Sequence, residues 1–260
     1  MLPKATYLSS AMTDITRIFQ GTEIALPGSA TLGFSASIWV IDAKLFEETV
    51  DGVHPSCPGS QIPSSWEAKY ACHNQEHPHD HGIMRVYCQG PDEGTEFLLP
   101  EIRAQQAAPL FEEPEAKAWK KFKEGECQSV PSLLGYGYFT QGQDGPVPGG
   151  YITYLVWANV PGEVMTPEQF WSFERPKRGL VRRKFRAAYE GLLSFGYVPG
   201  GAGINKVIWD TDSAELRIAG FRWPCRTPLG DKWSDGMLDT YSMIRPPESG
   251  RCDDFAKWEW

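Results

Sequence analysis

The segment from Arg186 to Trp223 constrains the fold more than any other part of this chain. Its first part is rich in helix-forming residues, and Tyr189 and Leu192 recur at the spacing of one helix face. Gly196 and the glycine-rich run at 198–203 predict that this helix ends in a loop. The segment therefore predicts a helix followed by a loop that returns to extended chain.

Two short apolar runs follow the loop. Lys206–Asp210 and Glu215–Ala219 predict a tight strand pair, because the turn-forming residues 211–213 join them. The loop ends in Asn205, and a Gly-Phe-Arg triplet at 220–222 follows the second strand. This order resembles the catalytic half of protein kinases.

The resemblance is to a degenerate domain, because the residues that carry the chemistry are missing. Kinases use an Asp as base and a second Asp, before the Phe of the triplet, to bind magnesium. Alignment on Asn205 places Gly200 at the first position, and alignment on Phe221 places Gly220 at the second. The chain is similar in this respect to short kinase-like proteins of filamentous fungi. The resemblance covers roughly residues 10–223.

Composition excludes several functional classes. The net charge of −8 and the pI near 5.2 argue against a nucleic-acid partner, which needs a basic surface. No apolar run approaches the ~20 residues of a membrane span, so no membrane association is expected. The N-terminus lacks the apolar core of a signal peptide, and the six cysteines form no CxxC pair. These features predict a cytoplasmic protein with free thiols.

The first fifty residues predict a hairpin. Segments 15–24 and 31–42 are rich in strand-forming residues, and the turn-forming run 27–29 separates them. In a kinase this hairpin would cover the nucleotide phosphates with three glycines. Only Gly28 and Gly33 stand here, which favours a plain turn.

Residues 50–82 form a polar insertion that holds all five histidines. His77, His79 and His81 alternate, so a strand would place three imidazoles on one face, where they could bind a metal. The alternative, which we adopt, is a solvated loop without a metal or other cofactor.

The resemblance assigns roles to one strand and one helix. Segment 83–88 occupies the position of the third small-lobe strand, and Arg85 stands where kinases carry a phosphate-binding Lys. Helix 114–123 follows, with Glu115 at the position that would pair with that residue. Glu115 is equally explained as a first-turn acid favoured by the helix dipole.

Segments 130–137 and 151–157 predict two more strands, and 158–162 matches the hinge between kinase lobes. Tyr154 and Trp157 are either ligand-facing aromatics at this hinge or core residues. Helices are predicted at 167–173 and 178–193. The basic residues of the second helix region form either a solvated face or a phosphate site, and we adopt the solvated face: Lys177, Arg178, Arg182, Arg183, Lys184 and Arg186.

These predictions combine into an α+β, two-lobed protein-kinase-like fold. The small lobe, residues 1–157, has a five-stranded antiparallel sheet and one helix. The large lobe, residues 158–260, is helical and reduced.

The expected function is binding of a small organic metabolite in the interlobe cleft, with cyclisation or isomerisation as the reaction class and no phosphoryl transfer. Arg85 and Glu115 are the catalytic candidates. The ligand-binding candidates are Tyr154, Trp157, Asn205, Phe221 and Trp223. The alternatives are a pseudokinase scaffold that binds a protein partner and a cryptic phosphotransferase. The sequence does not define an oligomeric state.

Overall fold

The computed structural model describes residues 18–50, 63–110, 112–228, 230–247, 250 and 254–260. Backbone contacts divide the chain into two compact units. Unit 1 comprises Met1–Glu113 and Leu133–Asn159, and unit 2 comprises Pro114–Ser132 and Val160–Trp260. The contacts therefore group helix-forming residues 114–124 with unit 2, whereas the sequence-based division places them in the small lobe.

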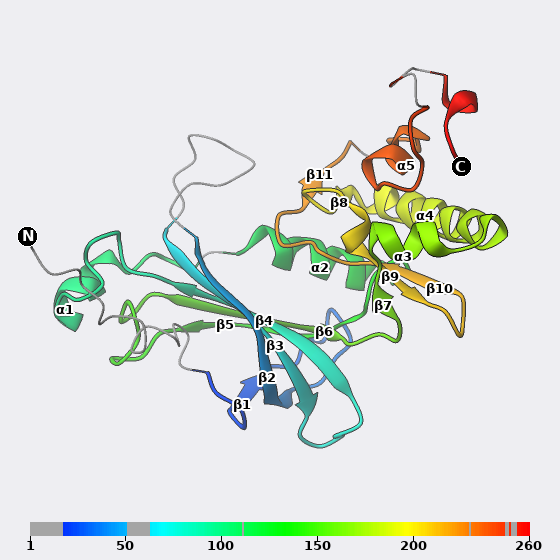
Figure 1. Cartoon of the computed structure of the whole chain (residues 1–260). Coiled ribbons are helices and arrows are strands. Elements are labelled where there is room, and N and C mark those ends of the chain that lie inside the picture. Colours follow the sequence, from blue (N-terminus) through cyan, green and yellow to red (C-terminus); the bar gives the residue numbers. More distant parts are fainter. Residues whose placement is uncertain (1–17, 51–62, 111, 229, 248–249, 251–253) are drawn as a thin grey trace, which may run out of the picture. The chain divides into compact units, whose positions relative to one another are not determined.

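Unit 1 is built on one antiparallel sheet (Figure 1). Its strands are β1 (Glu23–Leu26), β2 (Ser37–Val50), β3 (Ser65–Asn74), β4 (His81–Gln89), β5 (Leu133–Thr140) and β6 (Tyr151–Ala158). They lie in the order β1-β2-β3-β4-β6-β5. A short helix α1 (Pro100–Arg103) and a 3₁₀ turn η1 (Ala104–Gln106) follow β4.

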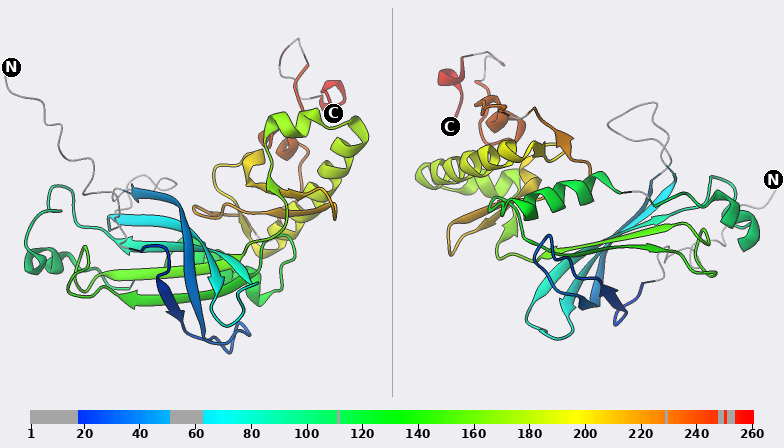
Figure 2. Two further views of the ribbon diagram at one scale, coloured as in Figure 1. Left: turned by 60° about the horizontal axis from the view of Figure 1, so that its bottom comes forward. Right: turned by 180° about the vertical axis from the view of Figure 1, so that it is seen from behind.

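The sheet of unit 1 is curled (Figure 2), and its concave side encloses an apolar core. The outermost strands β1 and β5 approach each other, and β2 bends at irregularities after Ile41 and Lys44. Phe34, in the β1–β2 connection, packs edge-on against Tyr136 of β5 at 5.9 Å. The core inside the curl contains Leu26, Trp39, Ile41, Ala68, Tyr70, Cys72, Met84, Val86 and Val156.

Strand β3 corrects the interpretation of residues 50–82 as a solvated loop. Ser65–Asn74 pairs with β2 on one side and β4 on the other, in the middle of the sheet. Its sequence, SWEAKYACHN, alternates Ala68, Tyr70 and Cys72 toward the core with polar residues on the other face. The polarity of that other face conceals the strand. The remaining part, 51–62, lies outside the described residues.

The other predicted strands lie close to observed strands, but the predicted number of strands differs from the observed number. The predicted strands at 83–88 and 151–157 lie within β4 and β6, and 130–137 overlaps β5. The prediction of five strands is wrong, since the described residues already form a sheet of six. The predicted strand at 31–42 begins only at Ser37, and within the described part of 15–24 only Glu23 and Ile24 are in β1.

Unit 2 combines helices with short strand pairs (Figure 1). Its helices are α2 (Pro114–Glu124), α3 (Pro167–Ser172), α4 (Arg175–Phe195) and α5 (Gly236–Thr240), with 3₁₀ turns η2 (Ile204–Lys206) and η3 (Phe255–Lys257). Its strands are β7 (Glu163–Val164), β8 (Tyr197–Val198), β9 (Val207–Asp210), β10 (Glu215–Ile218) and β11 (Cys225–Arg226). β9 pairs with β7 and β10, and β8 pairs with β11.

Local sequence explains the helix ends of unit 2. The Thr166 side chain accepts a hydrogen bond from the Gln169 N–H and caps α3. Helix α4 ends where Gly196 adopts a left-handed conformation, with φ of 73°. The predicted helices at 114–123 and 178–193 fall within α2 and α4, and the predicted strand pair after the loop corresponds to β9 and β10.

Among the described residues, no helix is both long and apolar enough to cross a membrane.

Candidate functional site

Arg85 lies on the outer face of the sheet of unit 1. Its Nη1 is 3.7 Å from Glu67 Oε2, and its guanidinium lies 5.9 Å from the centre of the Trp157 ring. Glu67 and Arg85 are both buried, on neighbouring strands β3 and β4. The structure thus identifies Glu67 as an acidic partner of Arg85. Glu115 belongs to unit 2, so its pairing with Arg85 stays a prediction.

Glu67 is part of a buried polar row that crosses three strands. Its direct neighbour on β4 is Tyr87, and the neighbour of Tyr87 on β6 is Thr153. Thr153 is fully buried, and no described residue forms a hydrogen bond with its Oγ1. Burying a hydroxyl in this state costs roughly 1–3 kcal/mol.

Tyr154 and Trp157 do not share a wall, which corrects their joint assignment beside Arg85. Trp157 and Arg85 are on the same face, because β4 and β6 place Ile83 opposite Trp157 and Arg85 opposite Leu155. Tyr154 points to the opposite face, where it packs against the core. Burial is the main cause that raises the pKa of Tyr154 to about 12, followed by Cys88.

Two of the predicted site residues in unit 2 are buried among side chains of that unit. Glu115 lies in the first turn of α2 and accepts a hydrogen bond from Trp119 Nε1 at 3.2 Å. Phe221 has no exposed surface and packs against Trp119 and Phe122, with ring centres 5.6 and 4.8 Å away. Phe221 is therefore a core residue and not the ligand-facing wall that the sequence suggested.

Gly200 and Gly220, the two positions that the sequence alignment places at kinase carboxylates, lie close to other atoms of unit 2. Asn205 is exposed in η2, and Trp223 is half-buried with the Arg222 guanidinium 5.4 Å from its ring. A Cβ atom added to Gly200 would lie 1.8 Å from the carbonyl oxygen of Trp223. Gly220 has φ of 82°, and a Cβ there would lie 2.5 Å from a side-chain carbon of Lys206.

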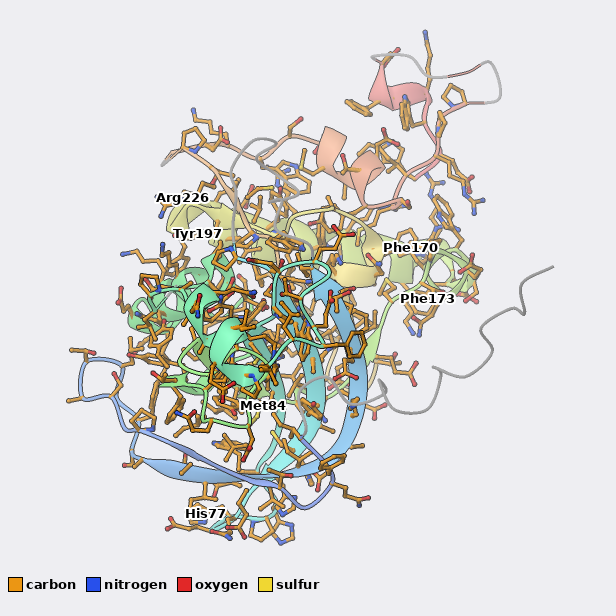
Figure 3. All side chains as sticks on the ribbon, turned by 90° about the vertical axis from the view of Figure 1, so that its left-hand side faces the viewer. His77, Met84, Phe170, Phe173, Tyr197 and Arg226 are labelled. Carbon is orange, nitrogen blue, oxygen red and sulfur yellow. The ribbon has the colours of Figure 1, made fainter. Side chains whose placement is uncertain are left out.

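His77 and His79 lie in a hairpin turn, which agrees with the adopted loop interpretation for this part of the chain, and not on a strand that would align them with His81. Figure 3 shows His77 at the end of the β3–β4 hairpin, away from Met84 in the core. Asn74 Oδ1 accepts hydrogen bonds from the N–H groups of Glu76 and His77, at 2.9 and 3.1 Å. This Asx-type turn places His77 and His79 in the connection, and His81 begins β4.

The hairpin turn helps to line a cavity of about 610 Å³ at one end of unit 1. The opposite wall comes from the β1–β2 connection and the start of β2, and the ends of β5 and β6 complete it. The lining residues are Phe34, Ser35, Ala36, Ser37, Trp39, Asn74, Glu76, His77, His79, Asp80, His81, Leu134, Ala158 and Asn159. All of them belong to unit 1. We call this space the mouth cavity.

The mouth cavity combines apolar walls with separate polar groups. Phe34, Trp39 and Leu134 are apolar, while His77, His79 and His81 offer imidazole nitrogens that donate or accept. The Asn159 N–H donates to the His81 carbonyl at 3.0 Å, which fixes the end of β6 beside the hairpin. The lining is therefore mixed, with nine polar and five apolar residues, and it offers both aromatic surface and hydrogen-bonding groups.

The donor set does not form a metal centre in this arrangement. Within the described part of the chain, no group of three or more His, Cys, Asp or Glu side chains is placed to hold a metal ion. His73 Nδ1 lies 2.7 Å from Asp42 Oδ1, and Cys72 faces the core, where burial first and Asp42 second raise its pKa to about 12. Neither side chain joins the three histidines.

Sequence reasoning missed Glu67, Thr153, Phe34 and Asn159. The alternation of SWEAKYACHN could have revealed Glu67, because it places this acid opposite the core face of a strand. No sequence signal brings Phe34 and Asn159 together, since their contact with one cavity depends on the curl of the sheet.

Comparison with known proteins does not assign a function to this geometry. No protein-family model matches the chain. No curated protein matches it. Among solved structures, the chain is similar to the kinase of Cydia pomonella granulovirus, with a TM-score of 0.38 and 10% sequence identity. The match covers 72% of this chain but only 55% of that kinase. A likeness of this size does not define an activity, which has to come from the residues themselves.

Proposed function

We propose that the chain is a small-molecule-binding protein and that the mouth cavity of unit 1 is its binding site. The observation that carries this proposal is the cavity itself, about 610 Å³ in volume, lined by polar groups together with the apolar side chains of Phe34, Trp39 and Leu134. Ligand sites in proteins have volumes of roughly 300–1,000 Å³ and occur at the mouths of curled sheets and barrels. The proposal keeps the small organic ligand expected from the sequence and moves it from the interlobe cleft to this cavity.

The charges of the lining define the ligand further. Among the described residues, the lining contains two carboxylates, Glu76 and Asp80, and no lysine or arginine. An anionic ligand would therefore be repelled, whereas a neutral or cationic one would not. Phe34 and Leu134 favour a planar, partly apolar body, and the imidazoles favour hydroxyl or amine substituents on it.

The proposal includes a degenerate protein-kinase-like fold without phosphoryl transfer. Gly200 and Gly220 support this part, because a side chain at Gly200 would meet the Trp223 backbone, and a side chain at Gly220 would be strained by its φ of 82°. Phosphoryl transfer depends on positioning and on metal ions held by such groups.

A ligand at a hundredfold excess over its Kd stabilises the folded protein by about 2.7 kcal/mol, which raises its melting temperature. Because we expect no binding of Mg-ATP, millimolar Mg-ATP should leave the melting temperature unchanged in a thermal-shift titration.

The cavity is tested with 2-naphthol, a neutral planar phenol, in a calorimetric titration of three proteins. Ala36 lines the cavity and is exposed, so Ala36→Trp fills the space without changing the core. Ala187→Trp places the same side chain on the exposed surface of α4 as the control. We expect the parent and the control to bind alike and Ala36→Trp to bind at least about tenfold more weakly. Equal binding by all three proteins would place the site elsewhere.

A protein partner is the second candidate, and one observation favours it. Phe97 and Leu99, just before α1, and Ile102, within it, are 78%, 66% and 41% exposed. Apolar surface of this kind marks interaction sites in soluble proteins. If a protein partner binds this apolar surface, the double variant Phe97→Ser, Leu99→Ser would abolish association with the partner and leave 2-naphthol binding unchanged.

A further inference from the structure

The basic residues of α4 divide into an exposed group and a buried group. The sequence suggested a solvated face for all of them. Arg183 and Arg186 are indeed exposed, and Arg186 pairs with Glu190 at 2.9 Å. Arg182, by contrast, is only 7% exposed, and Arg178 is partly buried beside it. The inward-facing arginines need a separate explanation, since burial of a charge is costly unless it is paired.

Three guanidinium groups gather around aromatic rings in unit 2. Arg178 and Arg245 lie 4.8 and 3.9 Å from the ring centre of Trp171. Arg182 lies 5.3 Å from the ring centre of Phe170, the α3 residue labelled in Figure 3. We call Arg178, Arg182 and Arg245 the arginine cluster.

Among the described residues, the arginine cluster holds three guanidinium groups beside one carboxylate side chain, that of Glu259, and Arg178 Nη2 also donates to the Trp260 carbonyl oxygen at 3.2 Å. Its acidic neighbour Glu259 is 3.8 Å from Arg178 Nη2 and 3.9 Å from Arg245 Nη1, longer than charge-assisted hydrogen bonds. Arg182 Nε donates to the Met243 carbonyl at 2.8 Å. Arg182 Nη2 and Arg178 Nε are buried, and no described residue accepts a hydrogen bond from either.

The electrostatics of Arg182 agree with this geometry. Burial is the main cause that lowers its pKa to about 10, followed by the positive charges of Arg178 and Arg175. Glu259 acts in the opposite direction and does not restore the ordinary value. An additional anion beside Arg182 would compensate the charge that remains.

We propose that the arginine cluster binds a doubly charged oxyanion, such as a phosphate group, and that Glu259 competes for the same arginines. Arginine forks match tetrahedral oxyanions through paired hydrogen bonds, which a single carboxylate at these distances does not provide. Glu259 is half-exposed and is held by two backbone hydrogen bonds to Arg245, at 2.9 and 3.1 Å. Its side chain can therefore be displaced without loss of the core. This site is independent of the mouth cavity.

The test is calorimetric titration with inorganic phosphate at constant ionic strength and near-neutral pH. The proteins are the parent, Arg245→Gln, Glu259→Ala and the control Arg186→Gln. Arg245 and Arg186 are similarly exposed, at 55% and 56%, so neither substitution disturbs the core. We expect Arg245→Gln to weaken binding at least about tenfold and Arg186→Gln to leave it within about twofold.

The Glu259→Ala variant shows whether the arginine cluster binds an oxyanion or only stabilises the fold. If Glu259 competes with the oxyanion, its removal should tighten phosphate binding at least about threefold. Unchanged or weaker binding by Glu259→Ala would contradict the competition. The absence of binding by both the parent and Glu259→Ala, or equal losses in Arg245→Gln and Arg186→Gln, would overturn the site. Sulfate in place of phosphate shows whether the charge alone is recognised.

Discussion

At the scale of single residues, the pair of Glu67 and Arg85 shows how burial changes the meaning of an ion pair. The two side chains are 1% and 11% exposed, whereas Lys121 and Glu124 form a pair of similar length, 3.8 Å, at the surface. Exposed pairs contribute about 0–1 kcal/mol, because water screens them. In the buried pair, water does not screen the charges, so the loss of either partner is felt more strongly.

Removal of one partner should therefore be far more costly in the buried pair. We expect Arg85→Met to lower the free energy of unfolding by roughly 3–5 kcal/mol, because it leaves the Glu67 carboxylate without this guanidinium. Lys121→Met should change it by less than about 1 kcal/mol. Urea unfolding of the two variants measures both values. Similar small losses in both would show that Arg85 does not stabilise Glu67.

The buried thiols predict how stability depends on pH. Burial raises the pKa of Cys88 from 9.0 to about 12, and burial with Asp42 does the same for Cys72. The folded state therefore keeps these protons when the unfolded state has lost them. This contribution to stability is complete below about pH 9 and is lost as the pH rises from about 9 to about 12.

Each such thiol should steepen the loss of unfolding free energy by up to about 1.4 kcal/mol per pH unit. Chemical unfolding at a series of alkaline pH values measures the slope for the parent and Cys88→Ala. The variant should lose stability less steeply in this window, whatever its absolute stability. Parallel slopes would contradict the assignment of Cys88 as a contributor.

At the scale of elements, hydrogen exchange at β3 distinguishes the strand seen in the structure from the loop that the sequence suggested. Ser65–Asn74 pairs on both sides within the sheet, and its amides are among those that global unfolding of unit 1 must expose. We expect hydrogen exchange at β3 to be as slow as at β4 and much slower than at β1, which pairs on one side only. Rapid exchange throughout 65–74, with protection of β4, would contradict the position of β3.

The elements also show which features local sequence can predict. The face of α4 that contains Tyr189 and Leu192 was evident from its spacing, and Gly196 ends that helix as predicted. β4 and β6 were evident because their residues are mostly apolar on both faces. β3 was missed because Glu67, Lys69 and His73 occupy its outer face, and such a polar pattern also describes a loop.

At the scale of the whole molecule, the candidate sites depend on contacts that no local pattern encodes. The mouth cavity unites segments 34–37, 74–81, 134 and 158–159, which meet only because the sheet curls. The arginine cluster unites α4 with Arg245, more than sixty residues beyond Arg182 along the chain. The sequence identified the three histidines and the basic helix as unusual, but their surroundings come from the fold.

The central claim, that unit 1 carries a small organic molecule in the mouth cavity, is tested most directly by native mass spectrometry of freshly purified protein. We predict an added mass on the parent and on Ala187→Trp that is lost from Ala36→Trp, with all three proteins folded by circular dichroism. A bare chain in all three, or an added mass that Ala36→Trp retains, would contradict the claim.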